Sequence, residues 1–334
     1  MADSQLIELT RNAKVLYELN ARQGDSVLVV TDSAQDPLVW TAVAAAGRFY
    51  GCEVTIIMMA DPRESHRTPP PQSVIESMKV ADLTISATSK EFHTGGFFKH
   101  ALDAGHKFLV MEGVTPAILM GPAVRADYRL MNEVGPSLKA LMDKGGRWHI
   151  SSESGTDFTC EVKPQSGRWM AAKADAANNA WGFALAAFPD GEFGADPVRG
   201  TGNGRVVWDT SVHHPAGLLR EPITLTIREG RVKKIEGGME AQQLIEFIEE
   251  FSVGKNDEFD IELSIGFNPK SPLTGVLRTD KKHYGKIHTA IGDDRKGQLH
   301  IDGVTRKPTI LINGEVVVDK GIIKVAPLDT WQRL

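Results

Sequence analysis

Histidines and an aspartate near the C-terminus have the types and spacing of a metal site. His283, His288 and His300 are three of the ten histidines in the chain, and Asp302 follows His300 by two positions. If 299–304 forms a strand, side chains two positions apart share a face, so His300 and Asp302 can hold one ion together. His288 would complete a set of two histidines and one carboxylate if its own short apolar segment pairs with that strand.

Two glutamates upstream stand where a charge is costly. Glu192 follows a turn after an apolar stretch, and Glu262 lies inside an otherwise apolar segment. A buried carboxylate raises the free energy of the fold unless it is paired or binds a metal, so both glutamates are candidate ligands. A plainer explanation is open for Glu262, because alternation places it on one face with Asp260 and Ser264, and that face can simply be solvated.

The composition narrows the function classes. The 334 residues predict two domains, and 41% hydrophobic and 24% charged residues are typical of a globular protein. A net charge of −5 offers no basic field for nucleic acid or for an anionic membrane surface. No apolar run approaches the roughly 18 residues of a membrane span, and the first residues lack a signal pattern, so we predict a cytoplasmic protein. Cys52 and Cys160 stand alone, which indicates neither a disulfide framework nor a thiolate zinc site.

The elements of the first half alternate between strands and helices. Apolar residues at three- and four-residue spacing predict a helix over 6–19. Buried strands are predicted at 26–31, 54–58, 83–87 and 108–111, and helices at 37–51, 72–80 and 97–104. This alternation is typical of βαβ units, so we predict an α/β fold whose first domain, 1–150, is a Rossmann-like, doubly wound parallel sheet with helices on both faces.

The loops of this domain carry no nucleotide-binding motif. Neither GxGxxG nor GxxxxGK[ST] follows a predicted strand, and the glycine-rich segment 200–204 precedes a strand rather than a helix. His93 lies in a loop where parallel sheets usually bind ligands, although an exposed loop histidine more often has no role.

The second half is rich in strands. Short alternating runs separated by turn signals such as Glu229-Gly230 and Asn313-Gly314 predict a series of hairpins, with one amphipathic helix over 239–251. We therefore predict a second domain, 151–334, of mixed α+β structure that carries the metal site.

In order along the chain, these motifs resemble the aminopeptidase T family of metallopeptidases. The matching segments are FPDGE at 188–192, ELSIGFNP at 262–269, GKIHTAIG at 285–292 and HIDG at 300–303. The resemblance implies that one or two divalent ions (zinc, cobalt or manganese) bind to Glu192, Glu262, His288, His300 and Asp302. The same architecture resembles 2,5-dihydroxypyridine 5,6-dioxygenase, a mononuclear iron enzyme, whose C-terminal histidine and aspartate match His300 and Asp302.

The sequence departs from both patterns. Where the peptidases carry a further glutamate, this chain reads Asp280-Lys281-Lys282-His283. A protonated lysine cannot be a ligand, so the second metal site is weakened unless His283 or Asp280 takes its place. The tyrosine that those peptidases carry after the GKIHTAIG segment is missing, with Tyr284 as a possible substitute. The dioxygenase has a histidine where this chain has Ser264, so the ligand set of the ring-cleaving enzyme is incomplete.

The main prediction is a metal-dependent hydrolase that cleaves an amide or peptide bond of a small substrate with a metal-activated water. Glu192 or Glu262 would then act as a bridging ligand or as the general base. One alternative is an Fe(II) dioxygenase for a hydroxylated aromatic ring, with His288, His300 and Asp302 as a facial triad and with Arg295, Lys296 and His93 as anchors for an anionic substrate. A second alternative is a binding protein without catalysis. The expected partner is a small molecule or short peptide, and the resemblance implies a homo-oligomer.

Overall fold

The computed structural model describes residues 2–61, 70–91, 106–180, 182–251, 257–259, 262–292 and 299–333. The chain forms two compact units. Unit 1 contains Met1–Glu133 and Met170–Asp190, and unit 2 contains Val134–Trp169 and Gly191–Leu334. The sequence predicted one boundary near residue 150, whereas the chain returns to unit 1 after that point.

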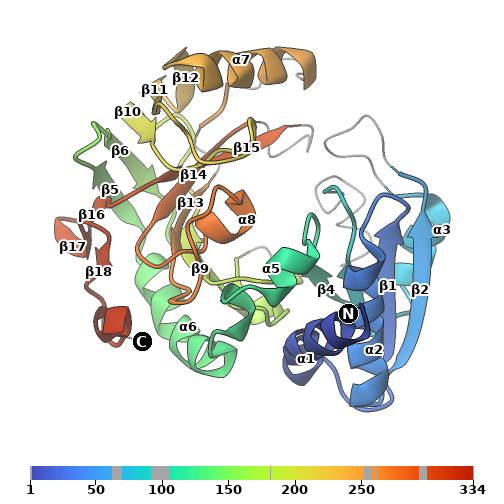
Figure 1. The fold of residues 1–334 in the computed structure, drawn as a ribbon. Helices are drawn as coiled ribbons and strands as arrows, with labels where there is room; N and C mark the ends of the chain where they lie inside the picture. The colour runs from blue at the N-terminus through green and yellow to red at the C-terminus, as the bar shows by residue number, and fades with distance from the viewer. Residues whose placement is uncertain are drawn as a thin grey trace. The chain divides into compact units, whose positions relative to one another are not determined.

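A parallel sheet forms the centre of unit 1 (Figure 1). Its strands are β1 (Ser26–Asp32), β2 (Glu53–Met59), β3 (Leu83–Ser86), β4 (Lys107–Val110) and β8 (Ala184–Ala187), in the order β2-β1-β3-β4-β8. All four neighbouring pairs are parallel, which confirms the predicted parallel α/β sheet. The fifth strand, β8, pairs with β4 and explains why residues after 150 belong to this unit.

Helices pack on both faces of this sheet (Figure 1). The helical elements of unit 1 are α1 (Ala2–Asn20), α2 (Pro37–Tyr50), α3 (Gln72–Met78), α5 (Pro116–Met120), the 3₁₀ turns η1 (Ala123–Arg125) and η2 (Ala176–Asn178), and the first part of α6 (Tyr128–Met142). Of these, α2, α3 and η2 contact the strands directly. Leu28 and Val30 of β1 pack with Val74 and Met78 of α3, while α2 contacts the sheet elsewhere and α1 packs on α2.

Local sequence sets the ends of α2. Asp36 accepts a hydrogen bond from the Leu38 amide, Pro37 occupies the first turn, and Gly51 ends the helix with φ of 96°. The predicted helix over 97–104 lies outside the described residues. The strand predicted as buried at 54–58 exists, but β2 is an edge strand with Ile56 and Met58 exposed, because no further strand of the described sheet pairs beyond it.

Unit 2 contains two sheets. An eight-stranded antiparallel sheet has the order β12-β11-β10-β6-β5-β16-β17-β18. Its strands are β5 (Gly146–Ser151), β6 (Asp157–Val162), β10 (Asn203–Trp208), β11 (Ile223–Arg228), β12 (Arg231–Glu236), β16 (Thr309–Ile312), β17 (Glu315–Asp319) and β18 (Ile322–Ile323). Helix α7 (Met239–Phe251) follows β12, and η3 (Leu328–Arg333) follows β18, as the labels of Figure 1 show for most of these elements.

The second sheet of unit 2 carries the candidate ligands. Its strands are β7 (Arg168–Met170), β9 (Glu192–Ala195), β13 (Leu263–Gly266), β14 (Ile287–Gly292) and β15 (His300–Thr305), in the order β15-β14-β13-β9-β7. The strands β9, β13, β14 and β15 pair antiparallel. The predicted pairing of the His288 and His300 segments is therefore confirmed.

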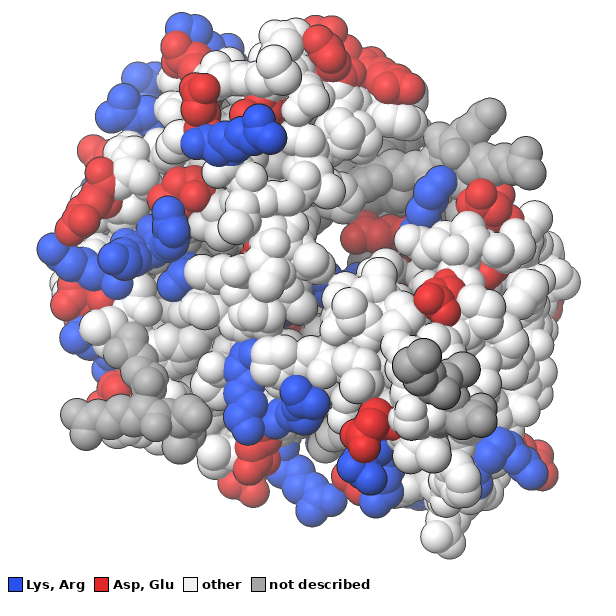
Figure 2. Space-filling view, in the orientation of Figure 1, with Lys and Arg blue, Asp and Glu red and all other residues white. Residues whose placement is uncertain are grey.

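Surface charge and helix hydrophobicity are both relevant to the partners of the chain. On the face drawn in Figure 2, basic and acidic side chains lie interspersed, and neither sign dominates that face. Within the described residues, no helix is both long enough and apolar enough to cross a bilayer.

Candidate metal centre

Strand register places the candidate ligands on one face of the second sheet. Opposite residues of an antiparallel pair point to the same face, and alternate residues along a strand share it. Glu192 is opposite Gly266, Ser264 is opposite His288, and Asp302 is opposite Ala290. Small residues, Gly266, Ser264 and Ala290, stand opposite Glu192, His288 and Asp302 on this face.

The other face of the sheet is apolar and fixes the strands. Leu263, Ile265, Ile287 and Ile301 are fully buried there. At Gly303 a Cβ atom would collide with the Trp208 ring, and the Trp208 indole donates a hydrogen bond of 2.9 Å to the Thr289 hydroxyl. The glycine after Asp302 is thus required by packing beneath the site.

One group of ligand atoms gathers around His300. His300 Nε2 lies 2.8 Å from Asp302 Oδ1 and 3.2 Å from Glu262 Oε2. The side chains of His300 and Glu262 keep 21% and 18% of their surface exposed, so this group is open to solvent. We call Glu262, His300 and Asp302 the open group.

A second group shares Glu262 and is closed. His288 Nε2 lies 3.3 Å from Glu262 Oε1 and 3.6 Å from Glu192 Oε2, and neither the His288 nor the Glu192 side chain exceeds 6% exposure. His288 Nδ1 is buried and has no hydrogen-bond partner within the described part of the chain. We call Glu192, Glu262 and His288 the closed group. The five predicted ligands therefore form two groups that share one carboxylate, rather than one cage.

This division differs from the predicted facial triad of His288, His300 and Asp302, which stays a prediction. His288 does not belong to the group that contains His300 and Asp302, and Glu262 takes the third position instead. The register accounts for this: His288 is opposite Val304, whereas Asp302 is opposite Ala290, so the two pairings lie two positions apart along β14 with Thr289 between them.

Three basic side chains neutralise the carboxylates. Arg168, with 1% of its side chain exposed, lies 3.1 Å from Glu262 Oε1 and 2.8 Å from Asp196 Oδ1. Lys281 Nζ lies 2.7 Å from Asp302 Oδ2, and Lys282 Nζ forms an ion pair with Glu192 Oε2.

These contacts keep the three ligand carboxylates ionised. Burial raises the pKa of Glu262, but Arg168 and hydrogen bonds from both histidines outweigh burial and hold that pKa well below its usual value. Burial likewise raises the pKa of Asp302, and Lys281 with His300 reverses the shift, so that pKa also falls well below normal. For Glu192, burial is outweighed by Lys282 and His288, and the pKa is lowered.

Sequence reasoning missed Arg168 and the part played by Ser264. Arg168 Nη2 donates to Ser264 Oγ at 2.7 Å, and Ser264 Oγ donates to Glu262 Oε1 at 2.9 Å. Ser264 is therefore an orienting residue for Glu262. The sequence contained one indication, because Arg168 directly precedes the apolar residues Trp169 and Met170. A charged residue in such a segment is rarely buried without a partner.

A close backbone contact positions Lys281 and Lys282 beside the ligand carboxylates. Both lysines follow the short helix α8 (Leu277–Asp280), and a Cβ atom at Gly266 would come within 2.7 Å of the carbonyl carbon of Lys282. Asn268 N donates to the Lys282 carbonyl at 3.0 Å, and Gly285 N donates to the Gly266 carbonyl at 2.9 Å. Because Gly266 has no side chain, this turn lies directly against β13.

The residues proposed as replacements for the missing peptidase groups have other contacts. His283 Nδ1 hydrogen-bonds to the Ser271 carbonyl, and His283 belongs to neither ligand group. Asp280 accepts hydrogen bonds from the amides of Thr274 and Gly275, and Tyr284 donates one of 2.6 Å to the Leu328 carbonyl. His93, Arg295 and Lys296 lie outside the described residues.

The open group has the geometry of a site for one divalent ion. With ion–ligand distances of about 2.1 Å, two ligands at right angles around an ion lie about 3.0 Å apart. The distances of 2.8 and 3.2 Å from His300 Nε2 to the two carboxylate oxygens bracket that value. Imidazole and carboxylate together suit iron(II), manganese(II) or zinc(II), so these three residues fit a divalent metal ion.

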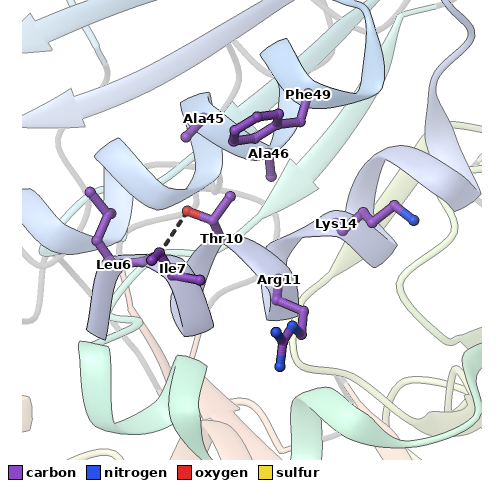
Figure 3. A pocket seen from close by; sticks show the side chains of 8 residues that line it. All are labelled: Leu6, Ile7, Thr10, Arg11, Lys14, Ala45, Ala46 and Phe49. Atoms are coloured by element: carbon purple, nitrogen blue, oxygen red, sulfur yellow. Dashed lines mark hydrogen bonds between the residues drawn. The ribbon is translucent and has the colours of Figure 1, made fainter. Parts of the chain in front are cut away.

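A pocket in unit 1 has a different character. It lies between α1 and α2 and has a volume of about 370 Å³ (Figure 3). Leu6, Ile7, Ala45, Ala46 and Phe49 supply its apolar lining, with Thr10, Arg11 and Lys14 beside them. This lining contains no carboxylate or histidine, so the pocket is no candidate metal centre.

Comparisons with known proteins distinguish between the two resemblances. The family model of 2,5-dihydroxypyridine 5,6-dioxygenase matches residues 6–325. The chain belongs to this family. A search of curated protein sequences found no significant match.

Two solved structures share the fold. The structure of 2,5-dihydroxypyridine dioxygenase from Pseudomonas putida KT2440 is similar with a TM-score of 0.80 and 17% identity, over 96% of this chain and 98% of that chain. Wild-type AmpT from Thermus thermophilus is similar with a TM-score of 0.65 and 14% identity, over 95% of this chain and 99% of that chain. At these identities the likeness shows the fold alone.

Membership of the dioxygenase family overturns the main functional prediction. The sequence motifs favoured an aminopeptidase T-type hydrolase, and the family match instead supports the dioxygenase alternative. The hydrolase hypothesis had relied on Glu192 and Glu262 as the carboxylates of a two-ion centre. In the structure both glutamates are engaged by basic side chains of the chain itself.

Proposed function

We propose that the chain is a ring-cleaving dioxygenase that uses one iron(II) ion held by Glu262, His300 and Asp302. The convergence of these three side chains on one partly exposed face of the sheet carries the proposal. The family match over residues 6–325 supplies the reaction class. The substrate class is a hydroxylated pyridine or a closely related hydroxylated aromatic ring.

Each residue around the open group has a defined task in this proposal. Bound iron(II) supplies the redox chemistry that lets O₂ react with an aromatic ring, which amino-acid side chains cannot provide. Lys281 holds the outer oxygen of Asp302, so its other oxygen faces His300. Arg168 and Ser264 hold Oε1 of Glu262, so Oε2 faces His300. These contacts fix the ligand atoms before an ion binds.

The donor set differs by one residue from the common set of two histidines and one carboxylate. Here the third ligand is Glu262, while Ser264 occupies the position where the sequence comparison placed a histidine in the dioxygenase. The extra carboxylate is offset by Arg168, which keeps the charge of the centre close to that of the common set.

The test is oxygen uptake by protein loaded with iron(II) under anaerobic conditions. We expect one iron per chain, and O₂ consumption with 2,5-dihydroxypyridine or with another member of a panel of dihydroxylated pyridines and benzenes. With ¹⁸O₂, mass spectrometry should find both labelled oxygen atoms in a ring-opened product. Binding of the ring compounds without O₂ uptake would instead identify a non-catalytic binding protein. The cytoplasmic location and the homo-oligomeric state stay predictions.

A further inference from the structure

The two ligand groups share a carboxylate, which is the arrangement of a two-ion centre. Glu262 presents Oε2 to His300 and Oε1 to His288, and each histidine has a second carboxylate nearby. Two-ion centres place their ions about 3.5–4 Å apart across such a bridge. The ligand atoms alone would therefore allow one ion in each group.

The closed group already contains cations of the protein. Lys282 forms an ion pair with Glu192 Oε2, the same oxygen that lies 3.6 Å from His288 Nε2. Arg168 and Ser264 bond to Glu262 Oε1, the oxygen 3.3 Å from the same nitrogen. Both carboxylate oxygens that face His288 are thus occupied by donors from the chain.

The open group differs in how its basic residue is attached. Lys281 binds Asp302 Oδ2, whereas the oxygen that faces His300 is Oδ1. The ammonium therefore lies on the outer side of the aspartate and leaves the ligand oxygen directed at the histidine. An ion can enter this group without displacing a lysine.

Charge leads to the same assignment. The carboxylates of Glu192, Glu262 and Asp302, with Asp196 beside Arg168, carry four negative charges, and Arg168, Lys281 and Lys282 carry three positive charges. One divalent ion at the partly exposed open group is screened by water. A second ion beside the buried Lys282 would place like charges together in a medium of low dielectric constant.

We infer that the Lys282 ammonium group is a built-in replacement for a second metal ion, and that it restricts the centre to a single ion in the open group. This inference rests on the proposed metal site of the previous section, but it concerns the number of ions and not the reaction. Lys282 is a positioning residue, since it acts on the centre through Glu192 and His288. Glu192 and His288 then form the inner wall of the site instead of a second ion site.

The experiment measures bound metal per chain, with no dependence on turnover. Metal-free wild type, Lys282→Met, Lys282→Arg and Lys281→Met are equilibrated with excess manganese(II), and again with zinc(II), then separated from free ion and analysed by elemental mass spectrometry. Lys282→Met has a similar length without the charge, and Lys282→Arg keeps the charge. Lys281→Met is the matched control, because it removes the neighbouring ammonium from the open group.

We expect one ion per chain in the wild type, in Lys282→Arg and in Lys281→Met, and two in Lys282→Met. Two ions in the wild type, or none, would overturn the inference, as would one ion in a folded Lys282→Met protein. If Lys282→Met does not fold, the wild-type and Lys282→Arg stoichiometries still test the claim, since two ions in either would refute it. A single-ion wild type that gains a second ion in Lys282→Met, but consumes no O₂, would refute the proposed reaction and support this inference.

Discussion

Removal of the buried guanidinium of Arg168 is the sharpest test of how the centre is held. With 1% of its side chain exposed, Arg168 binds Asp196 at 2.8 Å and Glu262 at 3.1 Å. Removing one partner of such a pair leaves a buried charge unpaired and costs about 3–5 kcal/mol. At about 2–4 °C per kcal/mol for a unit of this size, Arg168→Met should lower the Tm of the metal-free protein by roughly 6–20 °C.

The same substitution has a defined pH dependence. Glu262 has a lowered pKa in the folded protein, so its contribution to stability is present above its unfolded pKa of about 4.3 and is lost as the pH falls through the folded value. The difference in Tm between wild type and Arg168→Met should therefore be constant near neutral pH and shrink below about pH 4.

Differential scanning calorimetry of the two proteins from pH 3 to pH 7 provides the assay. Arg11→Met is the control, because Arg11 is 70% exposed and its pair with Glu8 is worth less than about 1 kcal/mol. If Arg168→Met lowers the free energy of unfolding by less than about 1 kcal/mol, Arg168 does not compensate the charge of the buried carboxylates, and this explanation is refuted.

Three further outcomes are expected. His300→Ala should lose bound metal, as measured by elemental analysis, while His149→Ala on an exposed strand position should retain it; full occupancy in the first variant would reject the open group as the site. Gly266→Ala should lower the free energy of unfolding, measured by urea denaturation, by about 1–3 kcal/mol, because the new Cβ atom would push the 281–283 turn away from β13. An unchanged urea midpoint would contradict that close contact. Burial lowers the pKa of Lys286 to about 8. Lys286→Met should therefore be more stable than wild type by on the order of 3 kcal/mol at pH 7, and this gain should shrink as the pH rises from 8 to 10. A gain in stability that does not depend on pH would show that Lys286 is not a buried charge.

The fold by itself does not choose the chemistry. The dioxygenase from Pseudomonas putida and AmpT from Thermus thermophilus share this architecture with the chain, at 17% and 14% identity. Under our inference, a single side-chain difference, the Lys282 ammonium beside Glu192, sets how many ions the site can hold. The function of a chain with this fold therefore has to be inferred from the contacts of its individual residues.

Local pattern was sufficient for much of the fold and for the list of candidate ligands. The period-2 alternation at 299–304 placed His300 and Asp302 on one face, and β15 with its 2.8 Å contact between the two side chains bears this out. Apolar runs separated by helical stretches predicted the parallel sheet of unit 1, because strands that are buried on both faces consist of nearly continuous apolar residues.

Tertiary structure decided how those ligands divide and what neutralises them. Register between β14 and β15 separates His288 from Asp302, and strand propensity contains no information on register between distant segments. Arg168 lies 94 residues from Glu262 in the sequence, and Lys282 lies 90 residues from Glu192. The sequence determined which groups can bind a cation, and tertiary packing decided that Arg168, Lys281 and Lys282 pair with the three carboxylates among them.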